Sequence, residues 1–383
     1  MGGCASKPED PEAKALRERT NAIEKQLEES RLMELSKIKL LLLGAGESGK
    51  STIFKQLRLL YGAPRSREDL KMFARVVKGN VTVLLKRLIP LVKSLELEGN
   101  FEENERAAYD KVLECISANA TETYTTPVQR NQMEIKQAEI DATLSVDLKE
   151  EIQTLFSSKT WETVWAERST VNAIDSHMLF INELDAISKP NYTPTTQHIL
   201  NARVRTTNAV KEEYDIDGQR FEIYDVGGQR SERKKWMPIF DGSDAVIFVA
   251  ALSEYDQKLA EAKRMNRMTE ALGLFKSIAN HHAFRKAPIL LFLNKKDLFE
   301  EKLLHSKIED QKDFSDYCGD GYEDATAYFI EKYRDCFINE EESDTRLFVH
   351  PTVATDTENV AFVWESCRNI ILEQNLRECE FLN

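Results

Sequence analysis

The chain has 383 residues, with 52 Lys and Arg against 65 Asp and Glu, and a formal net charge of −13 at pH 7. This length exceeds the usual size of one domain, so we expect two. The acidic balance argues against nucleic acid as a partner and against general attraction to anionic lipid. No run of 18 apolar residues occurs, so the sequence predicts no membrane-spanning helix.

The first residues carry a lipidation pattern. Residues 1–6, Met-Gly-Gly-Cys-Ala-Ser, fit M-G-x-x-x-[ST], which predicts myristoylation of Gly2 with Cys4 beside it as a palmitoylation candidate. One acyl chain gives marginal membrane binding, whereas two give a stable anchor. An ordinary small-residue N-terminus is the alternative. Residues 8–36 follow as a charged helical segment with a sparse apolar stripe, which is typical of an exposed helix that docks on a partner.

A phosphate-binding loop follows the first predicted strand. The apolar run at residues 38–43 leads into residues 44–51, GAGESGKS, which fit G-x-x-x-x-G-K-[ST]. Glycines let the loop N–H groups converge, and the helix predicted over residues 52–60 directs its positive end toward the phosphates. Lys50 is expected to reach the β- and γ-phosphates, and the Ser51 hydroxyl to ligate Mg²⁺. The pattern favours a nucleoside triphosphate as ligand over a glycine-rich turn that binds nothing.

A long interval separates this loop from the next motif. From Ser51 to Arg203 the chain runs about 150 positions, far more than a connection between a helix and a strand needs. Apolar residues there recur at helical spacing, as at Val77 and Val81, and strand-like alternation is scarce. We therefore predict an all-helical insert over residues 62–199. The alternative is a helical bundle that makes no contact with the ligand.

The segment after this insert offers two groups for phosphate chemistry. Thr206 could supply a second hydroxyl to Mg²⁺, and Arg203 a guanidinium for charge that develops on a transferred phosphoryl group. Taken without the other motifs, residues 200–207 would be interpreted as a basic strand edge.

A further strand is predicted to end at Asp225. Its carboxylate could hold the magnesium shell from the side opposite Ser51, directly or through water. Gly227 and Gly228 leave backbone N–H groups free to approach the γ-phosphate. Gln229 is neutral, both donor and acceptor, and so suited to orient an attacking water. The alternative is a glycine turn that leaves a strand.

The tetrapeptide at residues 294–297 bears on the base. It reads Asn-Lys-Lys-Asp, an N-K-x-D sequence, and follows the apolar strand predicted over residues 288–293. Guanine presents an N1–H and an amino group side by side, and the Asp297 carboxylate can accept from both, whereas adenine has neither donor there. A buried carboxylate left unpaired would reject the wrong base. The sequence therefore predicts a guanine nucleotide.

The rest of the chain alternates strands and helices. Residues 214–218 are predicted to form a hairpin tip around Asp-Gly. This alternation after a phosphate loop predicts an α/β fold with a mainly parallel, doubly wound sheet and the site at the carboxyl ends of its strands. Further strands are predicted over residues 245–250, 289–293 and 347–352, and helices over residues 265–278, 322–333 and 357–378.

Together these motifs resemble the alpha subunits of heterotrimeric G proteins. The matching stretches cover nearly the whole chain and are GAGESGKST at residues 44–52, the pair Asp175-Ser176, ARVRTT at 202–207, DVGGQRSERKKW at 225–236, FLNKKDLFEEK at 292–302 and TVATDT at 352–357. The resemblance implies a GTP-driven switch that is anchored to the cytoplasmic face of the plasma membrane, transduces receptor signals and slowly hydrolyses GTP to GDP. It also implies a lipidated N-terminal helix at residues 1–36, a Ras-like P-loop GTPase domain at 37–61 and 200–383, and an inserted helical domain at 62–199.

The resemblance assigns roles residue by residue. Arg203 is implied to be an arginine finger in cis and Gln229 to orient water, while Ser51 and Thr206 ligate Mg²⁺. Asp175 is implied to reach the nucleotide from the helical domain, which acts as a lid. The implied nucleotide contacts are Glu47, Ser48, Gly49, Lys50, Ser51, Thr52, Asp175, Ser176, Leu200, Arg203, Thr206, Asp225, Gly228, Gln229, Asn294, Lys295, Asp297 and Ala354.

The implied partners are a beta-gamma dimer, a seven-helix receptor or other exchange factor, and a downstream effector. The dimer would contact residues 8–36 and 230–236, and the receptor would read residues 375–383. Trp236 could equally belong to the core. Asn201 stands where the family commonly has arginine, Asn208 where it has glycine, and Ala262-Lys263-Arg264 where it often has acids.

Two other functions are compatible with a phosphate-binding loop. One is a scaffold gated by GTP that barely hydrolyses it, against which Arg203 and Gln229 argue. The other is a small-molecule kinase, which would not explain N-K-x-D beside a lipidation pattern.

Overall fold

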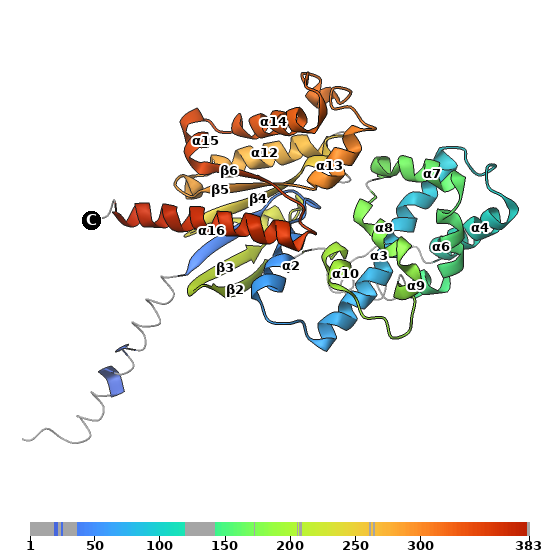
Figure 1. Ribbon diagram of the computed structural model, residues 1–383, viewed down its shortest axis with the longest axis horizontal. Helices are drawn as coiled ribbons and strands as arrows, with labels where there is room; N and C mark the ends of the chain where they lie inside the picture. The colour runs from blue at the N-terminus through green and yellow to red at the C-terminus, as the bar shows by residue number, and fades with distance from the viewer. Residues whose placement is uncertain are drawn as a thin grey trace, which may run out of the picture.

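The computed structural model describes residues 19–21, 24–25, 37–118, 142–171, 173–204, 206, 209–259, 262 and 265–380. Only the backbone is described at Asp175, Glu340, Glu342, Ser343 and residues 375–380. Two regions lie side by side in Figure 1. A sheet flanked by helices forms the sheet region (residues 37–61 and 202–380), and helices alone form the helical region (residues 62–201).

One sheet of six strands, in the order β2-β3-β1-β4-β5-β6, organises the sheet region. Every neighbouring pair is parallel except β2 and β3, which form an antiparallel hairpin. This arrangement confirms the predicted α/β class with a mainly parallel sheet. The strands are β1 (Ile38–Leu43), β2 (Val210–Ile216), β3 (Gln219–Asp225), β4 (Ala245–Ala251), β5 (Ile289–Asn294) and β6 (Leu347–Pro351).

The hairpin turn lies where Asp-Gly predicted it. Ile216 pairs with Gln219, so only Asp217 and Gly218 form the loop. Both have positive φ, 53° and 79°, as a two-residue type I′ turn requires.

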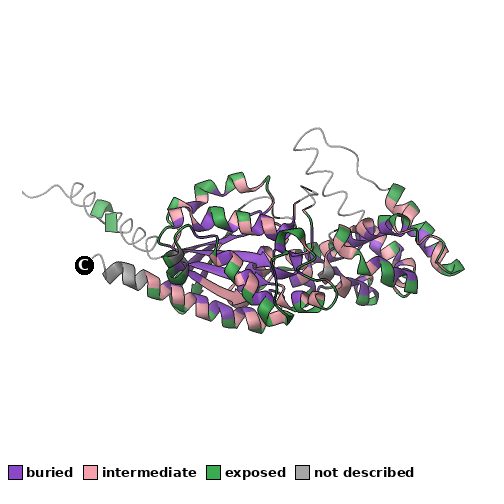
Figure 2. Cartoon of the chain, turned by 90° about the horizontal axis from the view of Figure 1, so that it is seen from above, coloured by how far each residue is buried: buried purple, intermediate pink, exposed green. Residues whose placement is uncertain are grey.

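Both faces of the sheet are buried, as expected for parallel strands covered by helices. Along β4, Ile247 and Val249 pack into a core with α2 (Lys50–Tyr61) and α16 (Thr357–Glu380). Their neighbour Phe248 faces a second core, formed with α12 (Arg267–Ala279) and α14 (Gly321–Arg334). Figure 2 shows the strands as the most continuously buried part of the chain. The remaining helices of this region are η3 (Arg233–Lys235), α11 (Met237–Phe240), η4 (Leu252–Glu254), η5 (His282–Phe284), α13 (Lys296–Leu303), η6 (Lys312–Phe314) and α15 (Glu340–Arg346).

The helical region has an apolar core of its own, around Val81, Leu84, Trp161 and Phe180. Its longest helix begins at a capping box, in which the Ser66 side chain accepts from the Asp69 N–H and the Asp69 side chain accepts from the Ser66 N–H. No strand occurs among its described residues. Its helices are α3 (Arg67–Ser94), α4 (Glu103–Ala118), α6 (Lys149–Phe156), α7 (Lys159–Ala166), η1 (Arg168–Val171), η2 (Asp175–His177), α8 (Met178–Asn182), α9 (Leu184–Ile187) and α10 (Thr196–Asn201).

The interpretation of residues 200–207 as a basic strand edge was wrong at its first two residues. Leu200 and Asn201, which open the basic segment, end helix α10 and do not belong to a strand edge. A capping box formed by Thr195 and His198 starts this helix, so the local backbone is helical before the segment turns toward the sheet.

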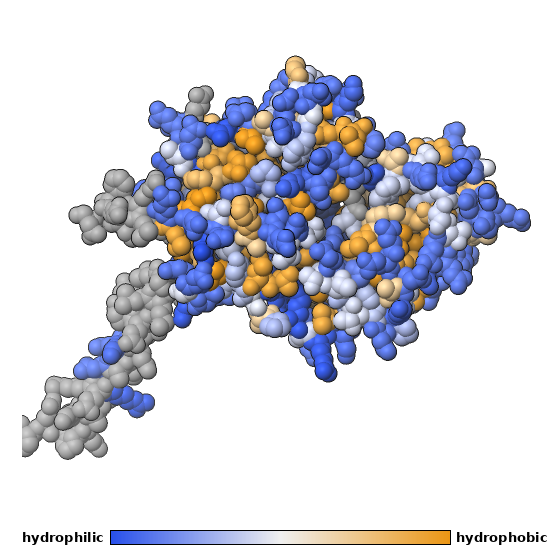
Figure 3. Space-filling model, in the orientation of Figure 1, coloured by the Kyte–Doolittle hydropathy of each residue, from blue (hydrophilic) through white to orange (hydrophobic). Residues whose placement is uncertain are grey.

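The surface mixes polar and apolar side chains. Figure 3 shows hydrophilic residues over most of the visible face, with apolar patches between them. Among the described residues, no helix is both long enough and apolar enough to cross a membrane.

Candidate functional site

A cavity of about 320 Å³ lies at the carboxyl edge of the sheet, where the sheet region meets the helical region. The loop after β1, the start of α2 and the segments after β3, β5 and β6 line it from one side. Ala173, Ile174 and Ser176 line it from the helical region. The motifs that are separate in the sequence therefore meet at one place.

The phosphate loop has the backbone that its glycines predict. Gly49 has a φ of 107°, and a Cβ there would lie 2.1 Å from the amide nitrogen of Asn294. Lys50 is buried inside the loop and donates to the carbonyls of Gly44 and Ala45, at 2.9 and 2.6 Å. Burial lowers the pKa of Lys50 to about 8, although the Asp225 carboxylate opposes this shift. The loop thus holds one ammonium at the centre of its concave backbone.

Three oxygen-bearing side chains meet beside Lys50. The Ser51 hydroxyl lies 2.8 Å from the Thr206 hydroxyl and donates to Asp225 Oδ2 at 2.8 Å. Asp225 therefore lies next to Ser51, because β1 and β3 are adjacent and Leu42 is in register with Asp225. Its place relative to a bound Mg²⁺ stays a prediction. Burial raises the pKa of Asp225.

This oxygen cluster fits a hard cation. Asp225 Oδ1 is buried without a hydrogen-bond partner among the described residues, and hydroxyl and carboxylate oxygens are ligands that Mg²⁺ accepts. No group of three or more His, Cys, Asp or Glu in the described part of the chain could hold a metal. A magnesium site here would therefore depend on the two hydroxyls.

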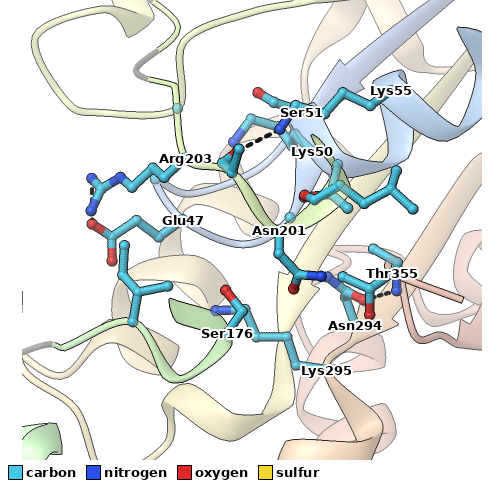
Figure 4. Close-up of a pocket in the computed structure, with 18 of the residues that line it drawn as sticks. Glu47, Lys50, Ser51, Lys55, Ser176, Asn201, Arg203, Asn294, Lys295 and Thr355 are labelled. Atoms are coloured by element: carbon cyan, nitrogen blue, oxygen red, sulfur yellow. Dashed lines mark hydrogen bonds and ion pairs between the residues drawn. The ribbon is translucent and has the colours of Figure 1, made fainter. Parts of the chain in front are cut away.

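Glu47 of the phosphate loop binds arginines from three elements. Its carboxylate lies 2.5 Å from Arg203, 2.9 Å from Arg267 of α12 and 4.0 Å from Arg87 of α3. Burial opposes ionisation, but the three arginines outweigh it and lower the pKa of Glu47 to about 2. Figure 4 shows the Arg203 guanidinium turned toward this carboxylate. Arg203 is thus held at the rim of the cavity in this conformation.

The segment after β3 packs directly against the phosphate loop. A Cβ on Gly228 would lie 2.6 and 2.7 Å from the backbone carbonyl oxygens of Gly44 and Ala45, so this close approach requires glycine. Gln229 is close by, since its Cγ would lie 3.3 Å from a Cβ on Gly46. The chain brings Gln229, Lys50 and the hydroxyls of Ser51 and Thr206 together in the cavity lining.

The same segment is fixed to α12. Arg233 and Arg230 both form ion pairs with Glu270, Arg233 at 2.7 Å. Trp236 is 3% exposed, and its indole N–H donates to the Gly227 carbonyl at 2.9 Å. Its side chain therefore belongs to the core, which was one of the two interpretations left open.

Within the N-K-x-D motif, Asn294 supports the neighbouring loops, whereas Lys295 and Asp297 face the cavity. Asn294 is buried; its amide nitrogen donates to the Ser48 carbonyl at 2.8 Å and its oxygen accepts from the Ala354 N–H at 2.9 Å. It therefore ties the phosphate loop to the loop after β6. Lys295 pairs with Glu254 at 3.2 Å and lines the cavity. Asp297 is exposed at the cavity wall, whereas a buried carboxylate was expected.

Most of the implied nucleotide contacts line the cavity. Ser48 and Asp225 lie behind the surface, and the side chain of Asp175 lies outside the described residues. The lining set is Glu47, Gly49, Lys50, Ser51, Thr52, Ser176, Leu200, Arg203, Thr206, Gly228, Gln229, Asn294, Lys295, Asp297 and Ala354.

Some lining residues were not anticipated. Glu254 and Gln257 follow β4, and the rule that ligands bind beyond the carboxyl ends of parallel strands could have indicated them. Lys55 lies one turn beyond the motif on α2, and no local pattern marks it.

The residues that depart from the family pattern lie in different places. Asn201 lines the cavity, and its amide nitrogen donates to the Gln197 carbonyl of its own helix at 2.9 Å. Ala262 accepts from the Met265 N–H in a turn before α12. Asn208, Lys263 and Arg264 lie outside the described residues, as do Gly2 and Cys4.

Comparison with known proteins agrees with this geometry. A family model described as G-protein alpha subunit matches residues 17–371, which is nearly the whole chain.

Proposed function

Because the chain belongs to the G-protein alpha subunit family, we propose that it is a membrane-anchored switch that hydrolyses GTP with its own arginine and glutamine. As a family member it is a guanine-nucleotide-binding alpha subunit, and members of this family are GTPases. The observation that carries the proposal is the convergence of Lys50, Arg203, Gln229 and Asp297 on one cavity.

In the proposed reaction, the phosphate loop holds the phosphates through its N–H groups and Lys50. Ser51 and Thr206 would hold Mg²⁺, with Asp225 behind them, and the ion would neutralise phosphate charge. Gln229 orients a water toward the γ-phosphate. Arg203 leaves Glu47 and stabilises the charge that develops on the transferred group, and turnover with an arginine in cis is on the order of 10⁻² per second.

The same contacts account for switching. Bound GTP would order the loops at Thr206 and Gly228, and hydrolysis would release them. The ion pairs of Arg233 and Arg230 with Glu270 support a fixed position for this segment in one of the two states. We propose that this state presents the effector surface and releases a beta-gamma dimer.

The remaining proposals concern location and partners. Lipids on Gly2 and Cys4 would anchor the chain to the cytoplasmic face of the plasma membrane. A seven-helix receptor or another exchange factor would act through the end of α16, and the beta-gamma dimer through residues 8–36.

Trp236 provides the first test. Its fluorescence should change on addition of GTP and then decay as phosphate is released, and the change should persist with a non-hydrolysable analogue. The buried indole, hydrogen-bonded to Gly227 beside the γ-phosphate position, is the reason to expect this response. Tight guanine nucleotide binding with no change in fluorescence would favour the scaffold.

Substitution tests the assigned catalytic roles. Arg203→Cys and Gln229→Leu should each nearly abolish hydrolysis and spare nucleotide binding, because both groups act on the transition state. Single-turnover phosphate release measures the rate. Fast turnover by either purified variant would refute these roles.

Asp297→Asn tests the base. The variant should lose on the order of 10³-fold in preference for guanine over adenine nucleotides, because it no longer accepts two hydrogen bonds from guanine. Competition between GTP and ATP measures this ratio. A wild-type chain that binds both equally would favour the kinase alternative.

A further inference from the structure

Two side chains, one from each region, form hydrogen bonds with the backbone of residues 199–203. Lys55 extends from α2 of the sheet region, and Asn80 from α3 of the helical region. This segment contains the end of α10, and its last residue is Arg203. Neither side chain belongs to a nucleotide-binding motif, and Asn80 lies outside the cavity lining.

Asn80 pairs with both polar groups of Arg203's backbone. The Arg203 N–H donates to Asn80 Oδ1 at 2.7 Å, and Asn80 Nδ2 donates to the Arg203 carbonyl at 3.3 Å. Asn80 is 8% exposed, so water competes little for these bonds. A carboxamide carries the donor and the acceptor that this double contact needs, whereas a carboxylate carries only acceptors.

Lys55 also forms hydrogen bonds with this segment. Its ammonium donates to the carbonyls of Ile199 and Ala202, at 2.9 and 2.5 Å. These carbonyls lie at the C-terminal end of α10, where a cation is favoured by the helix dipole. Because α2 starts within the phosphate loop, Lys55 links the segment to the element that holds the phosphates.

The face of α3 that carries Asn80 also reaches the arginine's ion-pair partner. Arg87 lies seven residues further along, almost two helical turns, and so on the same side of the helix. It approaches Glu47 at 4.0 Å, and Glu47 holds the Arg203 guanidinium. One helix of the helical region therefore contacts the backbone of Arg203 and approaches the carboxylate that binds its side chain.

We propose that Asn80 is a positioning residue for Arg203, so that the helical region sets the placement of the catalytic arginine, with Lys55 as a second anchor from the sheet region. This inference rests on the proposed role of Arg203 in hydrolysis. Loss of the Asn80 side chain leaves the arginine present but removes both of these hydrogen bonds to its backbone. A displacement of about 1 Å from productive geometry can cost on the order of 10²-fold in rate.

Single-turnover hydrolysis of preloaded GTP tests the proposal. Asn80→Ala should slow phosphate release by about 10- to 100-fold, while affinity for a non-hydrolysable GTP analogue changes by less than about 3-fold. Asn80→Asp, nearly isosteric, should also be slow because it lacks the donor, and it serves if the alanine variant fails to fold. Val81→Ala is the matched control: it trims the adjacent core residue of the same helix, and its rate should stay within about 2-fold of wild type.

A double-mutant cycle separates positioning from general loosening. In an Arg203→Ala background, Asn80→Ala should produce no further loss of rate, because Asn80 acts through Arg203. The inference is overturned if Asn80→Ala hydrolyses at the wild-type rate, if Val81→Ala is equally slow, or if the two losses multiply. If Arg203→Ala itself hydrolyses GTP as fast as wild type, the proposed function fails and not merely this inference.

Discussion

The sheet region and the helical region contribute to the cavity in different ways. The sheet region supplies the side chains to which we assign reactive and ligand-binding roles, including Lys50, Gln229 and Asp297. They lie on loops and first helical turns at the carboxyl ends of the parallel strands. The helical region lines the cavity with Ala173, Ile174, Ser176, Leu200 and Asn201. Its Arg87 and Asn80 lie outside the lining and contact the lining residues Glu47 and Arg203. The candidate chemical groups therefore lie at the strand ends, while the inserted helices line one wall of the cavity and contact the segment that carries Arg203.

Gly49→Ala should produce the largest effect, and only in the sheet region. A Cβ at φ 107° is strained, and it would lie 2.1 Å from Asn294. We expect guanine nucleotide affinity to fall by about 10³-fold, as measured by titration with a fluorescent nucleotide. Gly273→Ala on α12, where nothing lies within 4 Å, should bind normally. Normal binding by Gly49→Ala would show that the loop tolerates a different backbone.

Leu84→Ala addresses whether the two regions unfold separately. Leu84 is fully buried in the core of the helical region, so its truncation should cost about 3 kcal/mol there. Hydrogen exchange should speed up in α3–α10 and stay unchanged in β1 and β4. Met72→Ala, on the exposed side of the same helix, should change little. Equal acceleration in both regions would mean that they unfold as one unit.

Acidification should weaken the ion pairs of Glu47, of which the one with Arg87 joins the two regions. The folded pKa of about 2 lies below the ordinary value of 4.5, so the stabilisation is complete above about pH 4.5 and is lost as pH falls toward 2. Allowing for the 22% exposure of this side chain, we expect about 2 kcal/mol.

Urea unfolding of Glu47→Gln and wild type at several pH values measures this effect. The difference in unfolding free energy should be largest above pH 5 and shrink by pH 3. Glu309→Gln, an exposed carboxylate, is the control. A difference that does not vary with pH would contradict the ion-pair account.

Ser66→Ala should have the smallest effect of these changes. It removes half of the capping box at the start of α3, and loss of such a cap costs about 1 kcal/mol. The thermal transition of the helical region should shift down slightly, with GTP binding preserved. Ser277→Ala, exposed inside α12, is the control. An unchanged transition would indicate that tertiary packing alone fixes the start of α3.

Much of the site could be predicted because its motifs are local. The phosphate loop depends on glycines within eight consecutive residues, and the hairpin at Asp217-Gly218 depends on two. Alternating strands and helices indicated the sheet and its ligand-binding edge. The sequence could not show which residue of the motif at 294–297 supports the loops and which faces the cavity, because this depends on burial in the folded chain. Asn294 is enclosed between two loops, and Asp297 faces the cavity.

The phosphate loop, the guanine motif, the α/β class and the helical character of the insert could all be inferred from the order of residues alone. Two other features are visible only in the folded chain: Glu47 lies beside three arginines, and Asn80 forms hydrogen bonds with the backbone of Arg203, 123 positions away. The two sets of features differ in how far apart along the chain the interacting residues lie. Backbone turns and periodic burial are set by neighbouring residues, whereas an ion pair or an amide contact between distant segments exists only after the core of each region has fixed where its helices lie.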